Sequence, residues 1–246
     1  MNALLAAEAL KLRTTRTVWA LLAATVGLTV LAVTGAIIAA DDSTTLDLES
    51  DKGVRTVLHV SGSGAVFVLV LGIILAAGEY RQRTAVDTFL TTPRRERVIV
   101  AKLVVGALAG TVFGAVSAIA AIGVANHLYA SKGYTFPLES SDVWTILGGA
   151  VIYAALFGAV GAATGSLVRN QVGAIVGWLV WLAVAENVVL QVVPDVGRWF
   201  PVAAGRALVR DPDGELLSQP AAAGVLLIYA AAIMAAAIVV ERRRDA

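Results

Sequence analysis

The chain has 246 residues, of which 58% are hydrophobic and 15% are charged. Ordinary soluble domains carry roughly 25% charged residues, so this composition indicates an integral membrane protein. The absence of cysteine excludes disulfides and cysteine-based sites, and the two histidines are too few for a metal cluster. We expect no metal site and no nucleic-acid partner.

Six apolar segments are long enough to cross the hydrocarbon core of a membrane, which takes a helix of about 20 residues. They lie at about residues 18–40, 60–78, 103–125, 144–168, 172–193 and 221–240. Three residues, 169–171, separate the fourth segment from the fifth, which predicts a tight antiparallel hairpin. The predicted fold class is therefore an all-α integral membrane protein, with a single transmembrane domain over residues 1–246.

The distribution of lysine and arginine predicts the orientation of these spans. Thirteen of the 19 basic residues fall on the side that carries both termini, and six fall on the other side. Because cytoplasmic loops carry the excess of basic residues, both termini are predicted to be cytoplasmic. The predominance of arginine over lysine, with abundant Ala, Gly and Val, favours a G+C-rich bacterial genome. A multi-pass protein of the bacterial cytoplasmic membrane is the predicted location.

Residues 1–17 precede the first span and have two interpretations. In one, the segment is an amphipathic helix on the inner leaflet of the membrane. Its leucines share a face with Glu8 in the middle. Such a helix touches neighbouring spans or a partner, and Glu8 recruits a basic group. In the other interpretation, the segment is a basic tail that only sets the topology. Its basic residues include Lys11 and Arg13.

The inner connection from Glu79 to Lys102 is long and charged, and it contains the pattern of a short surface helix. Thr84 and Asp87 have the spacing of a capping box, and Pro93 ends the helix. An apolar face follows from the spacing of Val86, Phe89 and Leu90. Arginines surround this helix at Arg81, Arg94, Arg95 and Arg97. Such a segment predicts contact with a partner, a headgroup layer or a motor.

Glu186 lies within the fifth span, where a carboxylate costs on the order of 2.5–3.5 kcal/mol and faces protein or water. It is followed by Asn187 and, five residues on, by Gln191. One interpretation is a polar handle for a substrate in a central pathway. The other is a protonated or hydrogen-bonded contact between helices, or an outer position wetted by solvent. Residues 202–209, in the last outer connection, have the pattern of a short helix that dips into the outer interface.

Glycines recur every four residues on three spans, a spacing that lets helix backbones approach closely. We therefore predict close helix packing at these positions. They are Gly106, Gly110 and Gly114 on the third span, Gly161 and Gly165 on the fourth, and Gly173 and Gly177 on the fifth. A serine enzyme at Ser61 or Ser63, beside His59, is disfavoured because the spacing does not fit a nucleophile elbow.

The sequence contains no Gly-x-x-x-x-Gly-Lys-[Ser/Thr] loop, so any nucleotide-driven motor lies in a separate polypeptide. The arrangement of six spans, a basic first segment and a long inner connection resembles the membrane subunit of ATP-binding-cassette exporters of the type-2 permease family. The residues that carry the resemblance are Glu79, Thr84, Pro93, Arg95 and Lys102 in the inner connection. The run from Gly158 to Arg169 also resembles the small-residue stretch with which this family closes the fourth span.

The resemblance implies a non-catalytic permease half, with no cofactor of its own, that pairs with a second permease copy. Two cytosolic ATPase subunits would hold ATP and Mg. Residues 84–90 would be the coupling helix in a cleft of the ATPase, with Glu79 and the arginines at 94–97 at its rim. An amphiphilic drug, peptide antibiotic or lipid would leave along the dimer interface, between spans one, two and five. The alternatives are a secondary transporter that uses Glu186 for ion coupling, or a membrane scaffold or sensor subunit.

Overall fold

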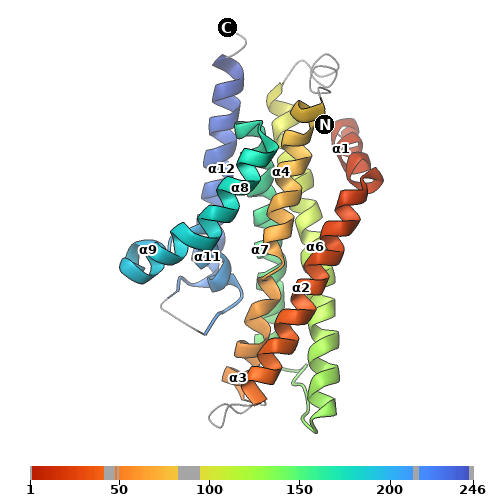
Figure 1. Cartoon of the computed structure of the whole chain (residues 1–246), viewed down its shortest axis with the longest axis vertical. Coiled ribbons are helices and arrows are strands. Elements are labelled where there is room, and N and C mark those ends of the chain that lie inside the picture. The colour runs from red at the N-terminus through yellow and green to blue at the C-terminus, as the bar shows by residue number, and fades with distance from the viewer. Residues whose placement is uncertain (1, 42–47, 49, 83–94, 213–215, 244–246) are drawn as a thin grey trace.

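The computed structural model describes residues 2–41, 48, 50–82, 95–212 and 216–243. These residues contain six helical stretches that are long and apolar enough to cross a membrane, which confirms the predicted all-α, six-span fold. The spans are α2 (Arg16–Asp41), α3 to α4 (Asp51–Leu58 and Ala65–Gln82), α6 (Arg95–Ser131), α7 (Ser141–Val168), α8 to α9 (Gln171–Val180 and Glu186–Val192) and α12 (Gln219–Arg243). Both termini lie at the same end of the molecule (Figure 1).

Helix α7 is the centre of the bundle. It packs against α4, α6 and α12, and 72% of its apolar window is buried. Glycines make this contact possible, because a Cβ on Gly110 would lie 2.3 Å from the carbonyl oxygen of Ala154 in α7. A Cβ on Gly161 would lie 2.2 Å from the carbonyl oxygen of Leu69 in α4. The backbones of these helices are therefore in direct contact.

The remaining predicted glycines divide into two groups. Those of the third and fourth spans also meet a neighbouring helix, since a Cβ would approach another backbone to within 3 Å at Gly106, Gly114 and Gly165. On the fifth span, the predicted glycines meet no other helix of the same chain. A Cβ on Gly177 would meet nothing within 4 Å, and one on Gly173 would meet only the side chain of Asn170.

The described helix ends opposite the termini form a small packed cap. Helix α6 has 37 residues, about 55 Å at the usual rise, whereas the hydrocarbon core is about 30 Å thick. The predicted outer loop at 41–59 includes α3, whose N-cap Ser50 accepts a hydrogen bond from the Gly53 amide. Tyr129, fully buried, donates a hydrogen bond of 2.9 Å to the carbonyl of Leu48. A hydrophobic cluster therefore includes Leu48, α3 and the adjoining parts of α2, α6 and α7.

An acidic residue at the start of α7 links the cap to the segment before α12. Asp142 Oδ2 accepts hydrogen bonds from Arg55 on α3, at 2.7 Å from its Nε, and Asp142 Oδ1 pairs with Arg210. A negative charge is favourable at this position because the N-terminus of a helix carries a partial positive charge. The outer ends of α3, α7 and the 209–212 segment are therefore held together.

The fifth span departs most from a regular helix. A π-helical turn, η2 (Trp181–Ala185), interrupts it, and the segment from α8 to α9 leans away from the bundle (Figure 1). Only 11% of its apolar window is buried within the chain. Two short helices follow, α10 (Pro194–Gly197) and α11 (Pro201–Leu208), and α11 matches the short helix predicted at 202–209. The predicted hairpin before α8 is confirmed, with Arg169 at φ 57° and Asn170 as N-cap.

Candidate functional site: a buried charge cluster at the end that carries both termini

Four charged side chains from three helices meet at the end of the molecule that carries both termini. Glu8 and Lys11 belong to α1 (Asn2–Thr14), Glu79 to α4 and Lys102 to α6. Lys11 Nζ lies 2.8 Å from Glu8 Oε1 and 2.5 Å from Glu79 Oε1. Lys102 Nζ lies 3.1 Å from Glu8 Oε2 and 2.8 Å from Glu79 Oε1. We refer to these four residues as the four-charge cluster.

The cluster is buried and electrically balanced. Glu8 is 0% exposed, Lys102 4% and Glu79 8%, while Lys11 sits at the edge facing solvent. Buried charges persist only when they are paired, and here each carboxylate contacts both ammonium groups. Burial alone would lower the pKa of Lys11, but its hydrogen bonds to Glu79 and Glu8 outweigh this and raise the pKa above its ordinary value. The charged form of Lys11 is therefore the stable one in the folded chain.

The position of the cluster in the sequence is as informative as its chemistry. Glu79 lies in the last turn of α4, and Lys102 lies in the second turn of α6. The cluster therefore joins the two helices that flank residues 83–94, and fastens α1 to both. The predicted coupling residues Thr84, Val86, Asp87, Phe89, Leu90 and Pro93 lie outside the described residues, and Arg81 and Arg95 lie in the flanking ends of α4 and α6.

The structure revises the expected role of two residues. Glu79 was expected at the rim of a partner's cleft, but its carboxylate points inward onto Lys11 and Lys102. Lys102 was expected to open the third span, but α6 begins seven residues earlier and Lys102 is already inside the bundle. Glu8 recruits a basic group, as one interpretation of the first segment proposed. Arg13 is exposed and lies outside the cluster.

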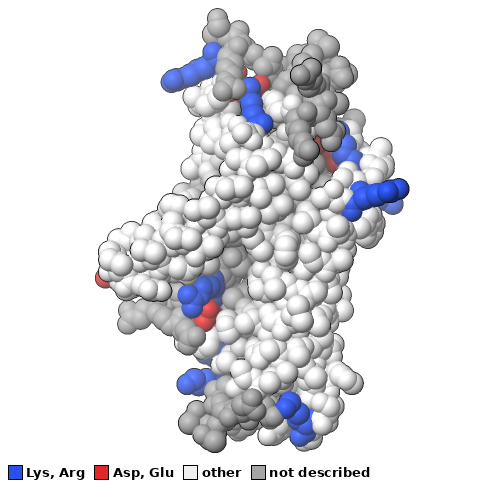
Figure 2. Space-filling view, in the orientation of Figure 1, with Lys and Arg blue, Asp and Glu red and all other residues white. Residues whose placement is uncertain are grey.

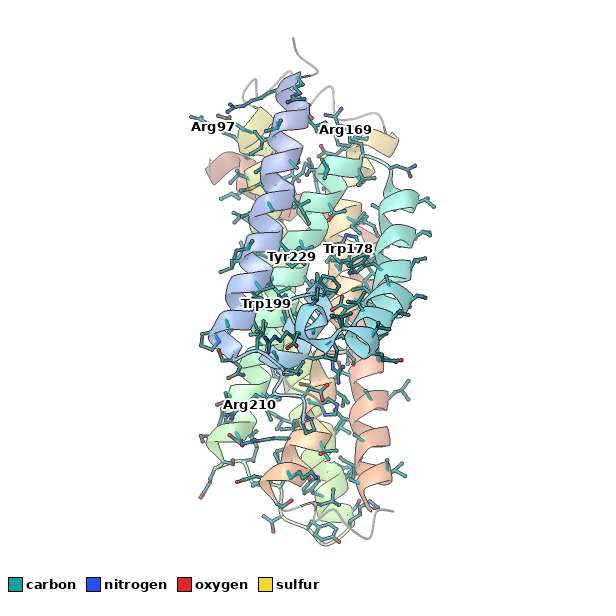
Figure 3. All side chains as sticks on the ribbon, turned by 90° about the vertical axis from the view of Figure 1, so that its left-hand side faces the viewer. Arg97, Arg169, Trp178, Trp199, Arg210 and Tyr229 are labelled. Carbon is teal, nitrogen blue, oxygen red and sulfur yellow. The ribbon has the colours of Figure 1, made fainter. Side chains whose placement is uncertain are left out.

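A second set of contacts continues from Tyr80, the neighbour of Glu79. The guanidinium of Arg169, in the hairpin between α7 and α8, lies 4.9 Å from the centre of the Tyr80 ring. Arg169 also pairs with Glu241 near the end of α12. Close by in the fold, Arg242 on α12 pairs with Glu96 in the first turn of α6. Figure 3 shows Arg169 and Arg97 at this same end of the molecule, whereas Arg210 lies toward the opposite end.

Glu186 is a structural anchor for a short helix. It is 0% exposed, and its Oε1 accepts a hydrogen bond of 2.7 Å from the amide of Ala203 in the first turn of α11. The first amides of a helix lack partners within the helix, so a carboxylate there satisfies one of them and complements the helix dipole. The π-helical turn just before Glu186 sets its direction. This arrangement matches the hydrogen-bonded interpretation of Glu186.

Asn187 and Gln191, predicted to share a pathway with Glu186, do not join it. The Asn187 side chain donates hydrogen bonds of 3.1 Å to the carbonyls of Leu182 and Ala183 on its own helix, and it is exposed. Gln191 is exposed as well. No group of three or more metal-binding side chains occurs within the part of the chain that the structure describes.

Six helices long enough to cross a membrane, with a buried charge cluster where α1, α4 and α6 meet, identify a multi-pass membrane protein. Comparison with known families identifies it further. The model of the family described as ABC-2 family transporter protein matches residues 4–180, from α1 through α8. The chain therefore belongs to this family and is a permease component of an ATP-binding-cassette (ABC) transporter. A comparison with curated proteins gave no match.

Proposed function

We propose that the chain is the permease half of an ATP-driven exporter in a bacterial cytoplasmic membrane. Its cargo is an amphiphilic or hydrophobic molecule, such as a drug, a peptide antibiotic or a lipid. ATP and Mg bind to a separate ATPase subunit, because the sequence contains no loop that cradles phosphates. Membership of the ABC-2 family supports this proposal. The four-charge cluster is the observation from which we argue the mechanism.

The four-charge cluster gives a route by which motion in the inner connection would reach the membrane. Residues 83–94 leave α4 at Gln82 and enter α6 at Arg95, so a push on this segment acts on the ends of both helices. Glu79 and Lys102 hold these ends together, and α1 is fastened to both through Glu8 and Lys11. Because α4 and α6 pack on α7 through direct backbone contacts, they move it as rigid elements.

A second permease copy is part of the proposal. The apolar windows of α2 and of the α8–α9 span are only 22% and 11% buried within the chain. Exposed apolar side chains on these two elements include Leu31, at 71%, and Val184, at 57%. In a membrane such faces contact lipid tails or another helix bundle. Pairing through them places the cargo route between the first, second and fifth spans of the two copies.

Co-purification of the partner ATPase tests this function. We expect an ABC ATPase encoded beside this gene to co-purify with the chain, and Phe89→Asp or Leu90→Asp to abolish the association. Each change puts a charge on the apolar face predicted for residues 84–90. Leu138→Asp is the matched control, since Leu138 is 40% exposed in the outer connection before α7. Undisturbed association in both inner variants would refute the coupling assignment.

A further inference from the structure

A pocket of about 480 Å³ opens between the first, second and fifth spans of a single chain. Its size falls in the range of about 300–1,000 Å³ that is typical of ligand sites. Ala32 of α2, Val66 of α4, Phe157 of α7 and Leu182 of η2 contribute to its apolar lining. Figure 2 shows this face hollowed beneath the arm formed by α8 and α9, with basic and acidic side chains at the lower edge of the hollow. We call this space the lateral pocket.

The surroundings of the lateral pocket face the hydrocarbon of the membrane. Leu31, next to the lining residue Ala32, is 71% exposed. Val180 and Val184, which flank the lining residues of the fifth span, are 56% and 57% exposed. Exposed apolar side chains of this kind contact lipid tails and not water when they lie within membrane spans. A molecule that enters the pocket between these rims therefore comes sideways from the bilayer.

One end of the pocket is polar and rich in hydrogen-bond donors. Arg206 of α11 and Asp211 line it and form an ion pair, with Arg206 Nε 2.6 Å from Asp211 Oδ2. His59 and Ser63 line the same pocket. An arginine guanidinium presents its N–H donors in a planar fork that suits the oxygens of a phosphate or carboxylate. This end matches a headgroup rich in acceptor oxygens, whereas the rest of the lining matches an apolar tail.

The polar end is held rigidly, because α11 is fixed along its whole length. Glu186 binds its first turn, and a Cβ on Gly205 would lie 2.1 Å from the ring of Tyr153. At the other end, Gln219 Nε2 donates a hydrogen bond of 2.6 Å to the carbonyl of Leu208. Arg206 is thus presented to the pocket by a helix that cannot shift easily. A preformed site loses less freedom on binding, which favours affinity.

We propose that the lateral pocket binds one lipid-like amphiphile, taken sideways from the membrane. Its tail lies among the apolar residues of α2, α4, α7 and η2, and its phosphate or carboxylate lies against Arg206. As the site of a transported cargo, the pocket rests on the function proposed above. As a binding site it stands by itself, because its lining comes from a single chain.

Native mass spectrometry of the purified chain tests this proposal, with lysophosphatidylglycerol as the probe. We expect one bound lipid per chain, and at least a tenfold weaker affinity in Ala183→Trp, which fills the pocket. Val184→Trp is the matched control, since Val184 is the next residue, does not line the pocket and is 57% exposed. Equal binding in the two variants would overturn the proposal.

A second pair of variants tests the headgroup. Arg206→Gln combined with Asp211→Asn removes both members of the ion pair and leaves the net charge of the chain unchanged. We expect this double variant to bind lysophosphatidylglycerol at least tenfold more weakly and to bind a monoacylglycerol of the same chain length as before. The control is Arg198→Gln with Asp195→Asn, a pair at 3.5 Å outside the pocket lining. Equal loss of both probes, or no loss of either, would overturn the role of Arg206.

Three other outcomes distinguish this proposal from pairing of two copies at the pocket and from the proposed exporter function. If a second copy of the chain fills the pocket, Ala183→Trp changes the fraction of dimer and leaves lipid binding unchanged, which overturns the inference. If lipid binding behaves as expected but no ATPase co-purifies, the pocket stands and the exporter function fails. If the ATPase co-purifies but Ala183→Trp leaves lipid binding intact, the exporter function stands and the pocket fails.

Discussion

Buried Glu8, Glu79 and Lys102, together with Lys11 at the solvent edge, form the main polar feature at the end of the bundle that carries both termini. Removing charges from water costs several kcal/mol per ion, and this is offset only by near-ideal pairing. Every pair in the cluster between one carboxylate and one ammonium lies at 3.1 Å or less. Such a group specifies one arrangement of α1, α4 and α6, since any other arrangement leaves a charge unpaired.

At the residue scale, we expect Lys102→Met to lower the free energy of unfolding by roughly 3–5 kcal/mol, the cost of breaking a buried pair by removing one partner. Glu8 and Glu79 would then share Lys11 alone. Thermal unfolding of the purified protein in detergent measures the loss. Adding Glu8→Gln to Lys102→Met leaves one carboxylate facing one ammonium, so this double variant should unfold at a higher temperature than Lys102→Met. Arg13→Met, an exposed change on the same helix as Glu8, should leave the unfolding temperature unchanged.

Part of the four-charge cluster could be predicted from the sequence. Glu8 interrupts the apolar face of its helix, which indicated that it attracts a basic group. Lys102 is 94 residues away, and no local pattern identifies it as the partner. Glu79 and Lys102 stood out only as the ends of a charged connection, and pairing across that connection depends on how α4 and α6 pack.

At the element scale, glycine spacing located the contact between α6 and α7, because only residues without a side chain permit backbones to touch. On the fifth span, which leans away from the bundle, the same spacing marks no contact with another helix of the chain, because Gly177 meets nothing within 4 Å and Gly173 meets only the side chain of Asn170. The π-helical turn and the tilt of this span have no counterpart in the sequence pattern. Glu186, directly after the turn, accepts a hydrogen bond from Ala203 in α11, and no local pattern identifies Ala203 as its partner.

Gly110→Val tests the contact between these helices. A Cβ at this position would lie 2.3 Å from the Ala154 carbonyl oxygen and 2.8 Å from its carbon, both backbone atoms that cannot rotate aside. We expect destabilisation of about 1–3 kcal/mol or more, the usual range for overpacking. Gly123→Val is the matched control on the same helix, where a Cβ would meet nothing within 4 Å. Equal unfolding temperatures for the two variants would contradict the described packing.

At the scale of the whole molecule, apolar length was enough to locate six spans, since the membrane fixes the length of a crossing helix. The outer cap was not foreseen. Residues 41–59 are polar on average, yet α3 buries Val54, Val57 and Leu58 against the ends of α2 and α7. Long-range packing of this kind depends on which helices are neighbours, and hydropathy does not contain that information.

We expect the four-charge cluster to transmit to the spans the conformational change that ATP hydrolysis drives in a partner ATPase. The chain contains no cysteine, so spin labels can be placed at Leu31→Cys on α2 and Val184→Cys on η2 without background. We would measure the distance between these labels by pulsed electron paramagnetic resonance in the reconstituted complex, before and after ATP. We expect the distance between the labels to change when ATP is added. We expect this change to be lost when Glu8→Gln and Lys102→Met are combined, although ATP is still hydrolysed. An unaltered distance change in that variant would contradict this expectation.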